Sequence, residues 1–178
     1  DLPVLLVFGG SRGAHSINMA VQAHLEALLK LAEVVHISGY EDYDAMVARR
    51  EQLPDDLRPR YHVEAYMHEH MVDALLAADL AVARAGAATL GEFPAAGLPA
   101  ILAPYPYSGQ HQSANAEYLA KRGAAVVIND SQLGDDLFPA IRELLTDEQK
   151  RRSMGAAARA CAVSDAADRL VRALAELA

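Results

Sequence analysis

The chain has 178 residues, of which 52% are hydrophobic and 22% charged, and this composition suits one globular domain with a sizeable core. Its formal net charge of −8 argues against a general DNA- or RNA-binding protein, because neutralising phosphates requires lysine and arginine. No apolar run approaches the roughly 20 residues that cross a bilayer, no signal peptide is visible, and the single cysteine, Cys161, excludes an internal disulfide.

Short apolar runs alternate with segments of helical periodicity along the chain. We predict strands over residues 3–8, 34–37, 61–65, 80–83, 99–103 and 124–128. Helices are expected over residues 16–31, 42–52, 67–78, 89–96 and 112–122. The tail from about residue 133 is predicted to be mostly helical, with breaks near 146–147 and 163–165.

This strict alternation predicts an α/β fold, a Rossmann-like parallel sheet of about six strands with helices on both faces. We expect residues 1–178 to form a single domain. Because the chain begins at Asp1 and runs almost at once into a strand, we also expect it to be excised from a longer protein. Ligands of open parallel sheets bind beyond the carboxyl ends of the strands, where the strand order reverses. Four loops follow strands and are expected to converge on that edge: residues 9–13, 65–70, 84–89 and 104–112.

The first candidate loop is Gly9-Gly10-Ser11-Arg12-Gly13, between the first strand and the first helix. It lacks the lysine of a phosphate loop, and its glycine spacing differs from that of the dinucleotide-binding fingerprint. Glycines nevertheless let the backbone turn tightly and approach a ligand closely, and backbone N–H groups at a helix start can hold a phosphate. A phosphate site and a ligand-free tight turn are equally compatible with this segment.

The second loop, residues 84–89, places four small residues at the end of a buried strand. Thr89 could cap the following helix or bond a phosphate oxygen. Glu92 follows in the Thr-x-x-Glu pattern of a capping box, which slightly favours a structural role for this carboxylate. The functional alternative is that Glu92 accepts hydrogen bonds from two sugar hydroxyls, for instance a ribose diol.

The third cluster, residues 105–115, is a loop rich in proline and glycine that opens a helix. Its polar side chains His111, Gln112 and Asn115 suit a hydroxyl-rich ligand such as a sugar, although a solvated helix start has the same composition. The segment His68-Glu69-His70 is not expected to bind a metal, because adjacent helical residues do not face one another and no further ligands complete a set.

Taken together and in order, three motifs resemble the MurG family, the glycosyltransferases that add N-acetylglucosamine to lipid I in bacterial peptidoglycan synthesis. The motifs are Gly9-Gly10-Ser11-x-Gly13-Ala14 with Asn18, Arg84-x-Gly86-Ala87-x-Thr89-x-x-Glu92 with Ala96-Gly97-Leu98-Pro99, and His111-Gln112-x-x-Asn115-Ala116. The resemblance covers residues 3–130, and the helical tail resembles the family more weakly.

The resemblance implies an inverting, metal-independent GT-B enzyme that needs no cofactor. This chain would be its C-terminal, donor-binding half, with UDP-N-acetylglucosamine as its ligand. By that analogy the donor's diphosphate lies near Gly10, Ser11, Gly13, Ala88 and Thr89. Glu92 would hold the ribose hydroxyls, and the backbone at His68 would read the uracil edge. His111, Gln112 and Asn115 would hold the sugar.

The resemblance also implies that the catalytic base, the lipid-linked acceptor site and the membrane contact lie in an N-terminal domain outside this chain. The chain alone is therefore expected to bind donor and to transfer nothing. The full-length enzyme would make lipid II from undecaprenyl-pyrophosphoryl-MurNAc-pentapeptide, as a cytoplasmic protein peripheral to the bacterial inner membrane.

Three alternatives remain open from the sequence. The chain could be an Alg13-like subunit of a split transferase, which would be complete as it stands and would pair with a membrane partner. It could belong to a UDP-N-acetylglucosamine 2-epimerase, which should carry further carboxylates and histidines near the sugar. It could also be a UDP-sugar-binding module without a catalytic role.

Overall fold

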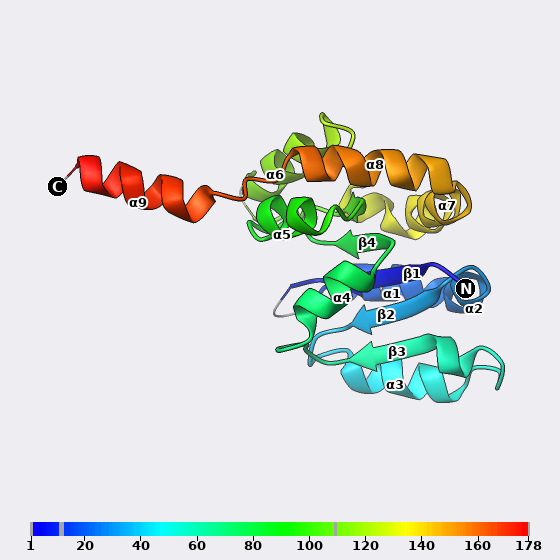
Figure 1. Ribbon diagram of the computed structural model, residues 1–178. Coiled ribbons are helices and arrows are strands. Elements are labelled where there is room, and N and C mark those ends of the chain that lie inside the picture. Colours follow the sequence, from blue (N-terminus) through cyan, green and yellow to red (C-terminus); the bar gives the residue numbers. More distant parts are fainter. Residues whose placement is uncertain (1, 11–12, 109, 178) are drawn as a thin grey trace.

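The computed structural model describes residues 2–10, 13–108 and 110–177. Its centre is a parallel sheet whose strand order is β3-β2-β1-β4-β5-β6. Figure 1 shows β3, β2, β1 and β4 following one another in this order. The strands are β1 (Val4–Phe8), β2 (Glu33–Ile37), β3 (Tyr61–Glu64), β4 (Leu80–Ala83), β5 (Ala100–Leu102) and β6 (Ala125–Val127). The chain thus builds one half of the sheet outward from β1, returns to the middle at β4, and builds the other half.

Helices cover both faces of the sheet, as the strand connections require (Figure 1). The α-helices are α1 (His15–Ala23), α2 (Leu25–Leu29), α3 (Tyr43–Glu51), α4 (Met71–Ala77), α5 (Thr89–Ala96), α6 (His111–Ala120), α7 (Leu133–Thr146), α8 (Glu148–Ala160) and α9 (Ala166–Glu176). Two short 3-10 helices, η1 (Arg58–Arg60) and η2 (Asp130–Gln132), precede β3 and α7.

The core is divided into two layers by the alternation of side chains along each strand. In β1, Leu5 and Val7 join a cluster with α1, α2 and α7, whereas Leu6 joins a cluster with α4, α5 and α6 on the opposite face. In β4, Leu80 and Val82 face the first cluster and the intervening alanines the second. Burial on both faces explains why these strands are continuously apolar in the sequence.

The predicted fold class and the position of every strand are confirmed, with element ends that shift by one or two residues. Two helix predictions were wrong in extent. Residues 16–31 form two helices, because His24 leaves the helical conformation with φ −122° and ψ 17°. The helix predicted from residue 67 begins only at Met71, with His70 at its N-cap and residues 68–70 in the bend and turn before it. The predicted breaks in the tail near 147 and 163–165 are both present.

The last helix, α9, projects away from the rest of the chain (Figure 1). It is strongly amphipathic, and its apolar side chains Leu170, Val171 and Leu174 are exposed. Within the described residues, no helix is long and apolar enough to cross a membrane.

A buried polar network lies between α1 and the sheet. The side chain of His36 in β2 is fully buried between Tyr61 of β3 and Asn18 of α1, which are themselves buried. Its Nδ1 lies 2.8 Å from the Tyr61 hydroxyl and its Nε2 lies 2.9 Å from Asn18 Oδ1. Burial lowers the pKa of His36 to about 4, against the opposing attraction of Asp42, so the imidazole is neutral at pH 7.

We predict that this histidine makes the fold sensitive to acid. The unfolded chain takes up a proton at His36 below pH 6.5, whereas the folded chain does so only near pH 4, so stability falls as the pH drops between these values. The shift corresponds to about 3 kcal/mol. Urea unfolding at pH 7 and pH 4 should show that wild type loses about this much more free energy of unfolding than His36→Gln. The exposed His62→Gln variant controls for the loss of a histidine, and an identical pH dependence of wild type and His36→Gln would contradict the prediction.

Candidate functional site

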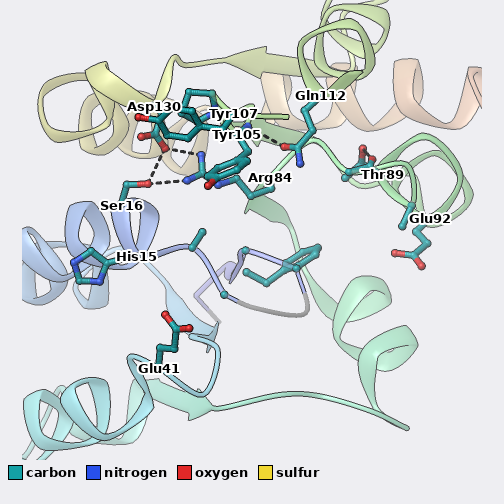
Figure 2. A pocket seen from close by; sticks show the side chains of 18 residues that line it. His15, Ser16, Glu41, Arg84, Thr89, Glu92, Tyr105, Tyr107, Gln112 and Asp130 are labelled. Carbon is teal, nitrogen blue, oxygen red and sulfur yellow. Dashed lines mark hydrogen bonds and ion pairs between the residues drawn. The ribbon is translucent and has the colours of Figure 1, made fainter. Parts of the chain in front are cut away.

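A cavity of about 690 Å³ lies at the carboxyl edge of the sheet, where the strand order reverses between β1 and β4. Its volume falls within the range typical of small-molecule sites. The loops after β1, β4 and β5 line it together with the starts of α1 and α5 and the turn after β6 (Figure 2). Its lining residues are Phe8, Gly9, Gly10, Gly13, Ala14, His15, Ser16, Glu41, Arg84, Gly86, Ala88, Thr89, Glu92, Tyr105, Pro106, Tyr107, Gln112 and Asp130.

Gly9, Gly10 and Gly13 of the glycine loop (residues 9–13) form one wall of this cavity. Gly10 and Gly13 both have left-handed backbones, with φ of 88° and 77°, and the Gly13 N–H donates to the Gly10 carbonyl at 3.0 Å. Gly13 also packs so closely on the loop after β2 that a Cβ there would lie 2.2 Å from the Ser38 carbonyl oxygen. These constraints explain why glycines occupy the loop. The predicted contact residue Ser11 and its neighbour Arg12 lie outside the described residues.

The turn from β4 to α5 forms the opposite wall. Thr89 lies at the start of α5 and is buried, and its hydroxyl donates to the Gly86 carbonyl at 2.6 Å. The interpretation of Thr89 and Glu92 as a capping box was wrong, because Ala88 occupies the N-cap position and no side chain caps this helix. Glu92 is exposed and lines the cavity, so its carboxylate is available for a ligand (Figure 2).

Two helix starts, those of α1 and α5, therefore border the same cavity. The backbone N–H groups of Ala14, His15, Ala87 and Ala88 donate to no acceptor within the described part of the chain. Such N–H groups and the positive ends of the helix dipoles stabilise an anion. This arrangement can bind a phosphate or diphosphate without a dedicated cation.

Arg84 ties together four of the segments that surround the cavity. Its guanidinium pairs with Asp130 and donates to Ser16 Oγ at 2.8 Å (Figure 2). It also donates to the Ala103 carbonyl at 3.1 Å. Ser16 Oγ in turn donates to Asp130 Oδ1 at 2.7 Å, which closes the triangle. The Arg84 side chain is only 10% exposed. Arg84 thus joins the end of β4 to α1, to the end of β5 and to η2.

The charges around the cavity are mostly negative. Among the described lining residues, Arg84 is the sole lysine or arginine, and Asp130 neutralises it, whereas Glu41 and Glu92 are unpaired in the described salt bridges. A diphosphate in this cavity would therefore depend on the helix starts and loop N–H groups more than on side-chain cations.

The third cluster reaches the cavity only in part. Gln112 lines it and accepts a hydrogen bond from the Tyr105 N–H at 2.9 Å (Figure 2). The Asn115 side chain donates to the Ala85 carbonyl at 3.0 Å and so stabilises the β4–α5 turn. His111 is the first residue of α6 and is exposed, but neither it nor Asn115 lines the cavity.

His68 also lies apart from the cavity. It belongs to a separate depression at the end of β3, where its ring lies 4.4 Å from that of Tyr66, measured between ring centroids. The predicted convergence of four loops therefore holds for the loops after β1, β4 and β5, whereas residues 65–70 line their own depression. Among the described residues, no group of three or more histidine, cysteine or acidic side chains is placed to hold a metal ion.

Several lining residues lie outside the predicted loops, namely His15, Ser16, Glu41 and Asp130, whereas Tyr105 and Tyr107 belong to the predicted third cluster without a predicted role of their own. Asp130 is an early polar residue after the sixth strand, so its place at the carboxyl edge was a usable signal. Ser16 and His15 lie in the first turn of the helix that follows the glycine loop, which is the usual position for ligand-facing polar groups.

The fold and the cavity define the chain as a Rossmann-like domain with a ligand site at the switch point of its sheet. Residues 4–170 match the glycosyltransferase family 28 C-terminal domain, and the chain belongs to this family. Among solved structures, MurG of Acinetobacter baumannii superposes with a TM-score of 0.80 at 28% identity, over 99% of this chain and 50% of that one.

Curated relatives extend the comparison. A UDP-N-acetylglucosamine--N-acetylmuramyl-(pentapeptide) pyrophosphoryl-undecaprenol N-acetylglucosamine transferase of Roseiflexus sp. (strain RS-1) is 49% identical over 96% of this chain and 43% of its own length. The enzyme of the same description from Chlorobium limicola is 41% identical over 100% of this chain and 48% of its own length. The chain thus spans less than half the length of these relatives. A UDP-GlcNAc 2-epimerase from Neisseria meningitidis, with a TM-score of 0.64 at 12% identity, shares the fold alone.

We predict that Gly13 tolerates alanine much less well than Gly10. Both substitutions place a side chain on a left-handed backbone, which costs about 1–2 kcal/mol, but only the Gly13 Cβ meets the Ser38 carbonyl, while the space at Gly10 is open. In urea unfolding, Gly13→Ala should lose about 1–3 kcal/mol more free energy of unfolding than Gly10→Ala. Equal losses for the two variants would contradict the close packing of the loop.

Proposed function

We propose that this chain is the donor-binding half of a glycosyltransferase that moves N-acetylglucosamine from UDP-N-acetylglucosamine to lipid I, giving lipid II. The observation that carries the proposal is the cavity at the switch point, bordered by two helix starts and by the Glu92 carboxylate. The curated relatives, whose printed names describe this transfer, support the choice of substrates.

In this proposal the donor's diphosphate lies between the glycine loop and the β4–α5 turn. Gly10 and Gly13 approach it from one wall, and Ala88 and Thr89 from the other; Ser11, outside the described residues, stays a predicted contact. Because the Thr89 hydroxyl and N–H both donate to the Gly86 carbonyl, the Ala88 N–H is the better placed donor of the pair. Glu92 then accepts hydrogen bonds from the two ribose hydroxyls.

The base and the sugar extend from the diphosphate in opposite directions. The uracil reaches beyond the cavity toward the backbone of His68, at the end of β3. The sugar faces the start of α6, where Gln112 Nε2 can donate to a sugar oxygen because Oε1 already accepts from Tyr105. His111 and Asn115 complete this side, with Asn115 bracing the turn through Ala85.

The chemistry of this half is the stabilisation of the leaving group. As the bond from the sugar C1 to the phosphate oxygen breaks, its electron pair remains on UDP, and negative charge grows on the diphosphate. The N–H groups of Ala14, His15 and Ala88 and the two helix dipoles stabilise that charge without a metal. The acceptor hydroxyl forms the new bond to C1 from the opposite face, which inverts the anomeric configuration.

The remaining components of the reaction belong, in this proposal, to the part of the protein that this chain does not cover. That part holds the base that takes the acceptor's proton, the lipid-linked acceptor and the membrane contact. The full-length protein would act as a peripheral protein on the cytoplasmic face of the bacterial inner membrane. This chain alone binds donor and transfers nothing.

We predict that the chain binds UDP-N-acetylglucosamine and UDP in EDTA and that Glu92 contributes through the ribose. Hydrogen bonds to a charged group contribute about 1.5–3 kcal/mol, so Glu92→Ala should raise the Kd of UDP roughly 10- to 100-fold in calorimetry. Wild type should lose a similar factor when 2′-deoxy-UDP replaces UDP, whereas Glu92→Ala should not distinguish the two ligands.

Glu117→Ala is the matched control, since Glu117 is an exposed carboxylate of α6 that pairs with Lys121 and does not line the cavity. Its Kd for UDP should equal that of wild type. The proposal fails if wild type binds neither UDP nor UDP-N-acetylglucosamine, or if Glu92→Ala and Glu117→Ala behave alike.

A further inference from the structure

We propose that His36 is a positioning residue for the glycine loop, acting through Asn18 on the Ser38 carbonyl against which Gly13 packs. The identity of the ligand rests on the proposed function, in which the glycine loop takes the donor's diphosphate. His36 does not line the cavity and is fully buried, so it acts on the loop and not on the ligand itself.

The direction of every hydrogen bond in the network is fixed by its chemistry. Asn18 Nδ2 faces two acceptors, the Ser38 carbonyl at 2.8 Å and Asp42 Oδ2 at 2.7 Å, so the amide nitrogen must point there. Asn18 Oδ1 consequently faces His36, whose Nε2 must carry the proton that it donates. His36 Nδ1 then accepts from the Tyr61 hydroxyl. Burial raises the pKa of Tyr61, which keeps this hydroxyl protonated.

The network reaches the glycine loop at the Ser38 carbonyl. The same oxygen that accepts from Asn18 lies where a Gly13 Cβ would approach to 2.2 Å, so the loop rests directly on it. The backbone of the Ser38–Gly39 segment is also held by β3 and the residue after it. The Ser38 N–H donates to the Glu64 carbonyl at 2.9 Å, and the Gly39 N–H donates to the Ala65 carbonyl at 3.1 Å. The Ser38–Gly39 backbone, on which Gly13 packs, is therefore held by Asn18 and by the end of β3.

A second branch of the network reaches the cavity wall. Asp42 Oδ1 lies 2.8 Å from His15 Nδ1, and His15 lines the cavity at the start of α1. Burial works to raise the pKa of Asp42, but hydrogen bonds from Asn18 and His15 outweigh it and keep this carboxyl ionised. Asn18 thus connects both the loop and the first residue of α1 to His36.

A histidine at this position completes a buried polar network, because an apolar residue would leave Asn18 Oδ1 and the Tyr61 hydroxyl without a partner. Buried polar groups contribute specificity when all of them are paired, and here the imidazole, the amide and the phenol each have partners. The neutral imidazole adds a hydrogen bond at Asn18 Oδ1 to the two made by Nδ2, so the amide is held at both of its polar atoms. The consequence is that Gly13 and the start of α1 are held in position before the ligand binds, which lowers the ordering cost of binding.

The test compares His36→Leu with wild type in two measurements on this chain. The first is the Kd of UDP, with uridine as the ligand that lacks phosphate; the second is amide hydrogen exchange at Gly13 without ligand, which reports the Gly13–Gly10 hydrogen bond. We expect His36→Leu to raise the Kd of UDP about tenfold, to leave that of uridine unchanged, and to speed Gly13 exchange about tenfold.

Three variants serve as controls. His36→Gln keeps an N–H donor for Asn18 and should restore both measurements toward wild type. Leu144→Ala removes a buried core side chain of α7 and should lower stability without changing UDP binding or Gly13 exchange relative to its neighbours. If His36→Leu does not fold, Asn18→Ala removes the donor to the Ser38 carbonyl and should give the same two changes.

The outcomes separate this inference from the proposed function. Unchanged UDP binding and unchanged Gly13 exchange in His36→Leu overturn the positioning role. An equal loss of UDP and uridine binding also overturns it, because the effect would then not be specific to the phosphates. If wild type binds no UDP while His36→Leu still speeds Gly13 exchange selectively, the proposed function fails and the positioning of the loop stands.

Discussion

The site depends on one topological constraint, the reversal of strand order between β1 and β4. The helix after β1 packs on one face of the sheet and the helix after β4 on the other, as their separate core clusters show. The two segments that follow these neighbouring strands must therefore run toward opposite faces of the sheet, and the cavity opens between them. Because both helices begin there, the same constraint brings two sets of backbone N–H groups and two positive helix ends to one place.

The remaining features of the site follow from keeping that opening small, rigid and suited to an anion. Glycines and alanines let the backbone come close, and the Arg84–Asp130–Ser16 triangle holds the surrounding segments together. Asp130 neutralises the charge of Arg84 in this triangle. The backbone N–H groups are therefore the principal source of positive potential along the described walls of the cavity. The buried network of His36 and Asn18 holds the Ser38 carbonyl, against which Gly13 packs.

Much of the fold was predictable because strand and helix periodicities differ and alternate without interruption along the chain. The loops at residues 9–13 and 84–89 were also predictable, since small residues after a buried strand mark the carboxyl edge. The break at His24 was not predictable, because the helical spacing of apolar residues continues from residue 16 to residue 31. Thr89 and Glu92 matched a capping pattern, but the backbone at Ala88 had already begun the helix. Pairings such as Asp130 with Arg84 join residues 46 positions apart and depend on tertiary structure.

The central claim, that a diphosphate lies between the glycine loop and the β4–α5 turn, is tested most directly by an NMR titration of the labelled chain with UDP in EDTA. We predict that the largest amide shifts occur at Gly10, Gly13 and Ala14 on one wall and at Ala88 and Thr89 on the other. Shifts confined to the depression lined by Arg151, Arg152 and Arg159, at the carboxyl end of α5, would contradict it. So would saturation by UDP without a change at either wall.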